Sequence, residues 1–325
     1  MIVRLQRWTV APLGALTLGV LAVVLWSGST VTEKVLLSQI PPVSLLVWQL
    51  GTSVALLWGL MFVSGTARPG RRDLLRLGWP GLLQPGLANL LLLLGLALTN
   101  ASTFGFLNAS ETPLGMFFAS VLLGERTSRP KVALTGLATL GALLVALNAP
   151  DAGIPASGHL NTAQGMGVLL VLCGTGLAAL YGAVSSASVS QAGSHPLVLT
   201  ALQQTLGLGV ALAAWCLLAL PRGELVVLAA LPPTTWGWAA LAGVFQYAVP
   251  FWFFLLALRS LSVSALSLLF TLGPIFVLVG AVLVLGERLS PIQICGAALT
   301  LLALGAVGLL QRGKLTRRSG RALKP

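Results

Sequence analysis

The sequence predicts an all-helical membrane protein, and the composition, the spacing of charge and the unbroken apolar runs lead to this fold class. Of the 325 residues, 56% are hydrophobic and 8% are charged, and the mean hydropathy is +0.94. A soluble globular protein carries about 25% charged residues, so a soluble protein is excluded. Residues 152–221 contain no Asp, Glu, Lys or Arg. Such stretches suit helices, which need about 20 apolar residues to cross a bilayer, whereas membrane strands alternate polar and apolar positions.

Polar and Pro/Gly-rich breaks divide the apolar sequence into ten predicted spans joined by short connections. These spans are residues 10–31, 43–64, 76–98, 102–123, 129–148, 163–190, 196–220, 235–258, 262–285 and 290–311. The longest connection, near 149–162, is rich in Pro and Gly, as loops are. No cleavage site follows the first apolar run, so we expect a retained span rather than a removed signal peptide.

The positions of Lys and Arg predict the orientation. With ten spans, 16 of the 19 basic residues fall on the side that carries both termini, and Lys34, Arg222 and Arg288 fall on the other. Positive charge favours the cytoplasmic side, so we expect a multi-pass protein of the cell membrane with both termini in the cytoplasm. The net charge of +12 comes from these loops and the tail, so it does not indicate a nucleic-acid partner.

An internal repeat relates the two halves of the chain. The segment Leu122–Ser128 recurs as Val284–Ser290, 162 residues later, and other pairs follow in the same order, among them Pro113 and Pro274. The repeat predicts two five-helix units, residues 1–149 and 163–311, followed by a basic tail, 312–325. Since five is an odd number, the two units should cross the membrane in opposite directions. Inverted repeats are typical of secondary transporters, in which a midplane site opens to each side in turn.

These motifs resemble the EamA-type branch of the drug/metabolite transporter superfamily. Each half has Leu-Gly-Glu-Arg before its last helix, and Trp26-Ser27-Gly28-Ser29 with Lys34 is similar to the family's first-helix pattern. The second helix of the family usually carries an Arg where this chain has Gln49, so no role of that Arg is carried over. The resemblance implies ten helices around a central cavity and transport of small metabolites, often export of amino acids.

Glu111 is the leading candidate for substrate binding or proton coupling. It lies about midway along the fourth predicted span, and the sequence places the other acidic residues near membrane edges. A charge at the bilayer centre costs about 2.5–3.5 kcal/mol on insertion scales, so such residues usually face a cavity and serve a function. Glu111 could exchange a proton, which makes protons a candidate coupling ion, or pair with a substrate amine. The alternative is a hydrogen-bonded carboxyl that locks helix packing beside Pro113.

Polar and aromatic residues inside the predicted spans complete the candidate cavity. They are Gln84, Asn89, Asn108, Gln246, Trp26, Tyr247 and Trp252. An unpaired amide costs several kcal/mol in lipid, so the amides should face inward, toward a ligand or toward one another. Gln84 and Gln246 are 162 residues apart, the offset of the repeat, and we expect them near the axis that relates the two units. The aromatic rings could wall a pocket for an apolar or cationic substrate.

Prolines and the Gly-Glu-Arg motifs supply the predicted hinges and gates. The hinge candidates are Pro85, Pro113, Pro250 and Pro274, because a proline inside a helix removes a backbone hydrogen bond. The residues expected to support structure or a gate are Glu125, Arg126, Glu287 and Arg288. They precede Ser128 and Ser290, which suit helix N-caps, and a carboxylate near a helix N-terminus is stabilised by the helix dipole.

The sequence therefore favours a secondary transporter that exports amino acids or related amphipathic compounds by alternating access. An uptake carrier for a neutral sugar or nucleoside-like solute, a channel and a scaffold protein are the alternatives. An enzyme is not expected, because its His, Cys and acidic residues do not cluster as catalysis or metal binding requires, so we predict no metal and no cofactor. The expected partners are a small-molecule substrate and the lipid bilayer. Both a monomer and a homodimer are compatible with the sequence.

Overall fold

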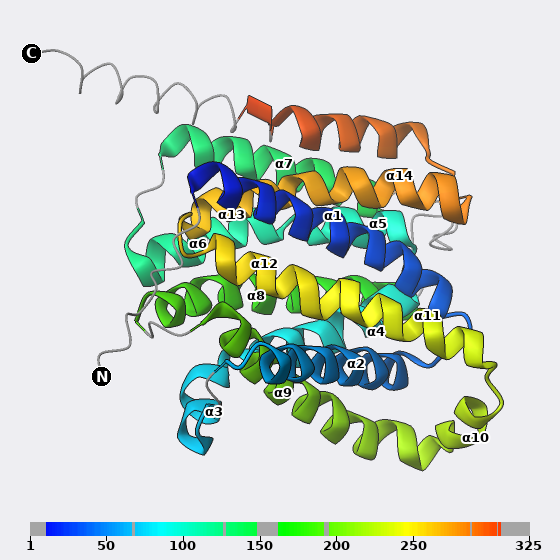
Figure 1. Ribbon diagram of the computed structural model, residues 1–325. Helices are drawn as coiled ribbons and strands as arrows, with labels where there is room; N and C mark the ends of the chain where they lie inside the picture. Colours follow the sequence, from blue (N-terminus) through cyan, green and yellow to red (C-terminus); the bar gives the residue numbers. More distant parts are fainter. Residues whose placement is uncertain are drawn as a thin grey trace, which may run out of the picture.

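The computed structural model describes residues 11–66, 69–125, 128–147, 162–191, 195–286, 288–303 and 305–306, and every regular element within them is a helix (Figure 1). The first half contains α1 (Pro12–Leu36), α2 (Pro42–Val63), α3 (Arg71–Gly78), the π-helix η1 (Leu82–Leu87), α4 (Ala88–Leu98), α5 (Ala101–Asn108), α6 (Glu111–Leu123) and α7 (Arg129–Leu147).

The second half repeats this order with more interruptions. It contains α8 (Thr162–Gln191), α9 (Pro196–Ala214), η3 (Trp215–Ala219), η4 (Leu220–Arg222), α10 (Glu224–Ala229), α11 (Pro233–Gly243), the π-helix η5 (Val244–Ala248), α12 (Val249–Ala257), α13 (Val263–Leu269), η6 (Phe270–Leu272), α14 (Gly273–Leu285) and a last helix, Pro291–Ala303.

Six helices among the described residues are long and apolar enough to cross a membrane. A seventh span results if Arg72–Gly78 and Leu82–Leu98, which are bent by 64°, form one broken crossing. Helices also occupy the three remaining predicted spans, as α7, α14 and Pro291–Ala303, but they fall outside this set. The protein is therefore all-helical with several membrane spans, and the count of ten stays a prediction.

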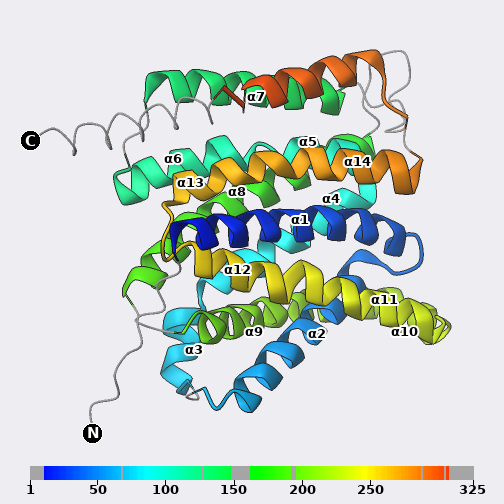
Figure 2. The same ribbon diagram turned by 45° about the horizontal axis from the view of Figure 1, so that its top comes forward.

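The two halves pack against each other in matched pairs of helices. Helix α4 packs on α8, and its counterpart α12 packs on α1; likewise α6 packs on α8 and α14 on α1. Helices α2 and α9, the second of each half, pack on one another. The first helices, α1 and α8, run in opposite directions (Figure 2). Exchanging the halves therefore reproduces the same contacts, as expected for two copies related by a two-fold axis in the membrane plane.

Two glycines at equivalent positions end the fourth helix of each half. Gly124 after α6 and Gly286 after α14 both have φ = 67°, a left-handed conformation that residues with a Cβ rarely adopt. These are the glycines of the repeated Gly-Glu-Arg motif. The motif is thus a helix stop that the two halves share in structure as well as in sequence.

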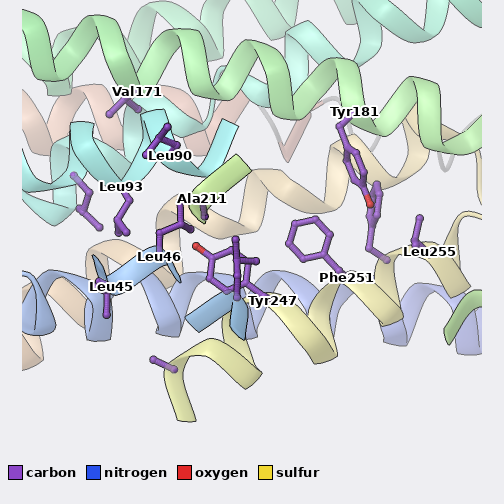
Figure 3. Packing of buried hydrophobic residues seen from close by; sticks show 14 of the residues in the cluster. Leu45, Leu46, Leu90, Leu93, Val171, Tyr181, Ala211, Tyr247, Phe251 and Leu255 are labelled. Atoms are coloured by element: carbon purple, nitrogen blue, oxygen red, sulfur yellow. The ribbon is translucent and has the colours of Figure 1, made fainter. Parts of the chain in front are cut away.

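Buried apolar side chains from both halves meet in the centre of the bundle (Figure 3). The core joins Leu46 of α2, Leu93 of α4, Val171 of α8 and Leu255 of α12. In Figure 3, Tyr181 of α8 extends toward Phe251 of α12, and the two rings have centroids 5.8 Å apart. This core holds in place the helices that surround the polar cavity.

Candidate functional site

A cavity of about 90 Å³ lies between the two halves. A hollow of about 10–15 Å³ can hold one water molecule, so the cavity has room for several waters or one small solute. The predicted substrate or proton-coupling residues that line it are Trp26, Gln84, Asn89, Asn108, Glu111, Gln246 and Tyr247. Gln84 and Gln246, the pair at the repeat offset, both reach it, one from each half. The structure thus brings together seven of the eight predicted residues.

Trp252 is the exception among these residues. It packs against a separate apolar cluster that includes Leu57, Met61 and Leu197, and its indole is not part of the cavity wall. Phe254, on the same helix, does line the cavity. At 3.6 residues per turn, positions two apart point about 200° away from each other, so the two side chains cannot share one face. The prediction that Trp252 walls the cavity is therefore wrong.

The fourth helix of each half is interrupted next to the cavity, although in the first half α5 and α6 still form one candidate span, Ala101–Leu123. In the first half the chain turns at Ala109 and Ser110, and Pro113 is the third residue of the new helix α6. In the second half the short helix η6 precedes α14, and Pro274 is the second residue of α14. Both prolines are thus in a first turn, where an N–H has no partner within the helix. The expectation that they lie in helix interiors is corrected, while their role as hinges stays a prediction.

The third helix of each half also changes character beside the cavity. Pro85 lies in the π-helix η1, where Gln84 has non-helical dihedral angles of φ −145° and ψ 126°. Pro250 is the second residue of α12, directly after the π-helix η5, which carries Gln246 and Tyr247. Irregular backbone is tolerated at membrane depth where it lines a cavity, and all four breaks do so through their own or adjoining residues.

Glu111 is the first residue of α6, so the break in the fourth helix places it at a helix N-terminus. The positive end of a helix dipole stabilises a carboxylate there. Glu111 also lines a second, smaller hollow between α6, α8 and α13. Phe254 and Phe270 border both hollows, and their rings stack with centroids 5.8 Å apart. Glu111 and these two rings therefore separate the central cavity from the smaller hollow.

Glu33 is a second acidic residue in the cavity wall, and the sequence analysis missed it. Helix α1 continues to Leu36, so Glu33 lies on the helix rather than in a loop, and its side chain is only 3% exposed. The side chains of Gln49 and Tyr247 approach its carboxyl group. Glu33 Oε1 and both polar atoms of the Gln49 amide are buried without a hydrogen-bond partner in the described structure. Unsatisfied buried groups of this kind are expected where a ligand binds.

A spacing signal for Glu33 was present in the sequence. Trp26, Thr30 and Glu33 follow one another at intervals of four and three, which places them on one face of a helix, and all three line the cavity. The adjacent Lys34 points to a different partner. Its Nζ donates a 2.9 Å hydrogen bond to the carbonyl oxygen of Leu96 and another to that of Thr99, at the end of α4. A cation is favourable at a helix C-terminus.

Aromatic rings line the cavity together with these polar groups. Trp26 contacts Phe251, Phe254 and Phe270, with centroids 5.2, 6.0 and 5.6 Å away. The Trp26 indole N–H donates a 2.9 Å hydrogen bond to the carbonyl oxygen of Gln246 in η5, which fixes the orientation of the ring. The cavity wall thus combines aromatic rings with carboxyl and amide groups. Such a surface suits a solute with one apolar and one polar end.

Glu125 joins the two halves beyond the smaller hollow. Its Oε2 accepts a hydrogen bond from the backbone N–H of Ser264, at 3.3 Å, and another from the Ser264 hydroxyl. This contact ties the end of α6 to the start of α13. Of the other predicted gate residues, Arg126 and Glu287 lie outside the described residues, and Arg288 is exposed. The gate role of the motif stays a prediction.

Removing the Ser264 hydroxyl tests the contribution of this junction. We expect Ser264→Ala to lower stability by about 1 kcal/mol, below the range of about 1.5–3 kcal/mol for hydrogen bonds to fully buried charged groups, because Glu125 is only partly buried. In the Ser264→Ala background, Glu125→Gln should lower stability less than it does in the wild-type protein, because both changes remove the same interaction. Thermal unfolding of the detergent-solubilised variants measures both effects. Fully additive losses would show that the two residues act independently.

Comparisons with known proteins support the fold. A crystal structure of another protein is similar at a TM-score of 0.68 and 17% sequence identity, over 93% of this chain and 98% of that chain. At this identity the likeness concerns the fold alone. No curated protein matches the sequence. The EamA-like transporter family matches twice, over residues 13–147 and 165–309, which is one match for each half of the bundle. The chain therefore belongs to the EamA-like transporter family.

Proposed function

We propose that the protein is a secondary carrier that moves a small solute through the central cavity by alternating access. Its family makes it a multi-pass membrane transporter of small solutes. The observation that carries the proposal is the cavity itself, which both halves line and which Glu111 borders at a helix break. Rocking one half against the other would expose this cavity to each side in turn.

The helix breaks and the closed junction give this motion a structural basis. The breaks before α6 and α14 occupy equivalent places in the two halves, so they can act as paired hinges. The end of α6 and the start of α13, which Glu125 and Ser264 join, lie at the same end of the bundle as the start of α1 (Figure 2). With the N-terminus in the cytoplasm, as the distribution of Lys and Arg predicts, this junction closes the cytoplasmic side. Opening it would connect the cavity to the cytoplasm through the smaller hollow.

The lead substrates are amino acids or related amphipathic compounds, and the proposed direction is export. Glu111 can pair with an amine or exchange a proton, while the ring of Trp26 can contact an apolar side chain. Uptake of a neutral sugar or nucleoside-like solute is the second candidate. The amides of Gln84, Asn89, Asn108 and Gln246 favour it, because they can bind hydroxyl groups.

A growth screen tests both direction and substrate class. Cells producing the wild-type protein or Glu111→Gln are grown at inhibitory levels of individual amino acids, amines, sugars and nucleoside analogues. Protection by the wild-type protein alone supports export of that compound, and increased sensitivity supports uptake. Cells that lack the protein are the reference, and equal growth of these cells and the wild-type cells on every compound, with the protein present in the membrane, would contradict the proposal.

A further inference from the structure

The ionisable carboxyl groups in the wall of the central cavity have no basic side chain beside them among the described residues that line it. Glu33 and Glu111 both line it, and no Lys, Arg or His does so among the residues that the structure describes. Lys34 is next to Glu33 in sequence, but its ammonium group binds the carbonyl oxygens of Leu96 and Thr99. A zwitterionic or anionic solute would therefore meet two carboxyl groups and no side-chain cation to pair with its own carboxylate.

Backbone groups offer little compensation for an anion. Helix N-termini can bind carboxylates through free N–H groups. At the start of α14, however, Pro274 has no N–H to donate, and the N-terminus of α6 is occupied by Glu111 itself. The cavity thus offers a substrate carboxylate only neutral donors, from its amide and hydroxyl side chains, and no cation to balance the buried charge.

The surroundings of Glu33 are well equipped to bind an ammonium group. Gln49 from α2 and Tyr247 from η5 approach the Glu33 carboxyl, and Asn89 from α4 approaches the Tyr247 hydroxyl. Three acceptors, Glu33 Oε1, Gln49 Oε1 and Asn89 Oδ1, and one donor, Gln49 Nε2, are buried without a hydrogen-bond partner in the described structure, so acceptors outnumber donors. An ammonium group has three N–H donors and no acceptor, which matches this set. It also supplies the opposite charge that a buried carboxylate needs.

The rest of the cavity suits the apolar or aromatic part of a solute that carries an ammonium group. Trp26, Tyr181, Phe254 and Phe270 line it, and ring faces attract both apolar groups and cations. We propose that the cavity binds organic cations, namely primary amines with an aromatic or apolar body and no carboxylate, and that Glu33 accepts the amine. This inference rests on the proposed transport function. It excludes free amino acids and keeps, among the proposed substrates, the related amphipathic amines that have no free carboxylate.

Three matched probes test the proposal by isothermal titration of the purified full-length protein in lipid nanodiscs. They are 2-phenylethylamine, phenylalanine methyl ester and phenylalanine, which share a ring and an amine and differ in the carboxylate. We expect the amine and the ester to bind about tenfold more tightly than phenylalanine, and Glu33→Gln to weaken amine binding about tenfold through loss of a charged hydrogen bond. Glu224→Gln, which changes an acid on α10 away from the cavity, should leave binding unchanged.

Each unfavourable outcome bears on a separate claim. Binding of phenylalanine that equals or exceeds that of the amine overturns the substrate class, and unchanged amine affinity in Glu33→Gln overturns the role of Glu33. If Glu33→Gln does not fold, Tyr247→Phe removes the neighbouring hydroxyl, and unchanged amine affinity in that variant is the contradicting result. The growth screen judges transport itself, so transport of a zwitterion or a sugar would leave the proposed function standing while refuting this inference.

Discussion

Replacing Glu111 by Gln is expected to abolish the pH dependence of transport and to reduce its rate about tenfold or more, with normal levels of protein in the membrane. Glutamine keeps the size and hydrogen-bonding capacity of the side chain but cannot take up or release a proton at physiological pH. Glu111 borders both hollows, so a proton or an amine that passes from one to the other meets its carboxyl group. If Glu111 were purely structural, Glu111→Gln would change neither the transport rate nor its pH profile.

The measurement is solute flux into proteoliposomes at acidic, neutral and alkaline pH. Glu224→Gln is the matched control, because Glu224 is also an acid but accepts a 2.6 Å hydrogen bond from Ser44, outside the cavity. The control should follow the wild-type profile. The proposed role of Glu111 is refuted if the flux and pH profile of Glu111→Gln match those of the wild type.

Replacing Gly81 by Ala is expected to produce the largest loss of stability. A Cβ at Gly81 would lie 1.9 Å from the carbonyl oxygen of Gln203 and 2.5 Å from the carbonyl carbon, both backbone atoms of α9. Backbone atoms cannot swing aside as a flexible side chain does, so α9 would have to move away from η1. Overpacking costs typically about 1–3 kcal/mol, and this contact is closer than most, so we expect about 3 kcal/mol or more.

Gly209→Ala is the matched control, because Gly209 lies on α9 itself and a Cβ there would have nothing within 4 Å. It should be neutral or slightly stabilising, since Ala favours helix more than Gly by about 1 kcal/mol. Thermal unfolding of both purified variants measures their stabilities relative to the wild-type protein. Equal stability of the two would show that the close approach of η1 and α9 contributes nothing. Because Gln84 follows Gly81 by three residues, we also expect Gly81→Ala to disturb the cavity wall.

The amide side chains of the cavity wall could be predicted from the sequence. Amides such as Gln84, Asn89 and Gln246 must face inward because lipid cannot satisfy them, and the structure places all three in the cavity wall. The helical segments follow from long apolar runs, which have few alternatives in a membrane. The repeat of the Gly-Glu-Arg motif likewise corresponds to two helices that end in the same left-handed glycine.

Glu33 was harder to place, because its helical spacing from Trp26 and Thr30 is a weaker signal than an amide inside an apolar run. A Glu-Lys pair after an apolar run is typical of the end of a membrane span. The sequence does not show that α1 continues through this pair. The structure gives each charge a separate environment: Glu33 faces the cavity, and Lys34 binds the end of α4. Only the packing of α1 against its neighbours decides this. Trp252 was misplaced for a related reason, because hydropathy does not reveal which face of an apolar helix points inward.

Helix breaks were also only partly predictable. The prolines marked the region, but they do not specify whether the helix kinks or restarts. In the first half it restarts two residues before Pro113, and Glu111 thereby becomes the first residue of α6. Whether such a break forms depends on the neighbouring elements, which must accommodate the carbonyl groups that the helix leaves free.

Counterflow in proteoliposomes tests the carrier mechanism most directly. Vesicles are loaded with each unlabelled compound from the growth screen and then given a trace of the same compound carrying a radiolabel. Alternating access through one cavity predicts saturable accumulation of the label that depends on the internal solute and is lost in Glu111→Gln. Flux that rises linearly with concentration and is indifferent to the internal solute would indicate a channel and would contradict the account.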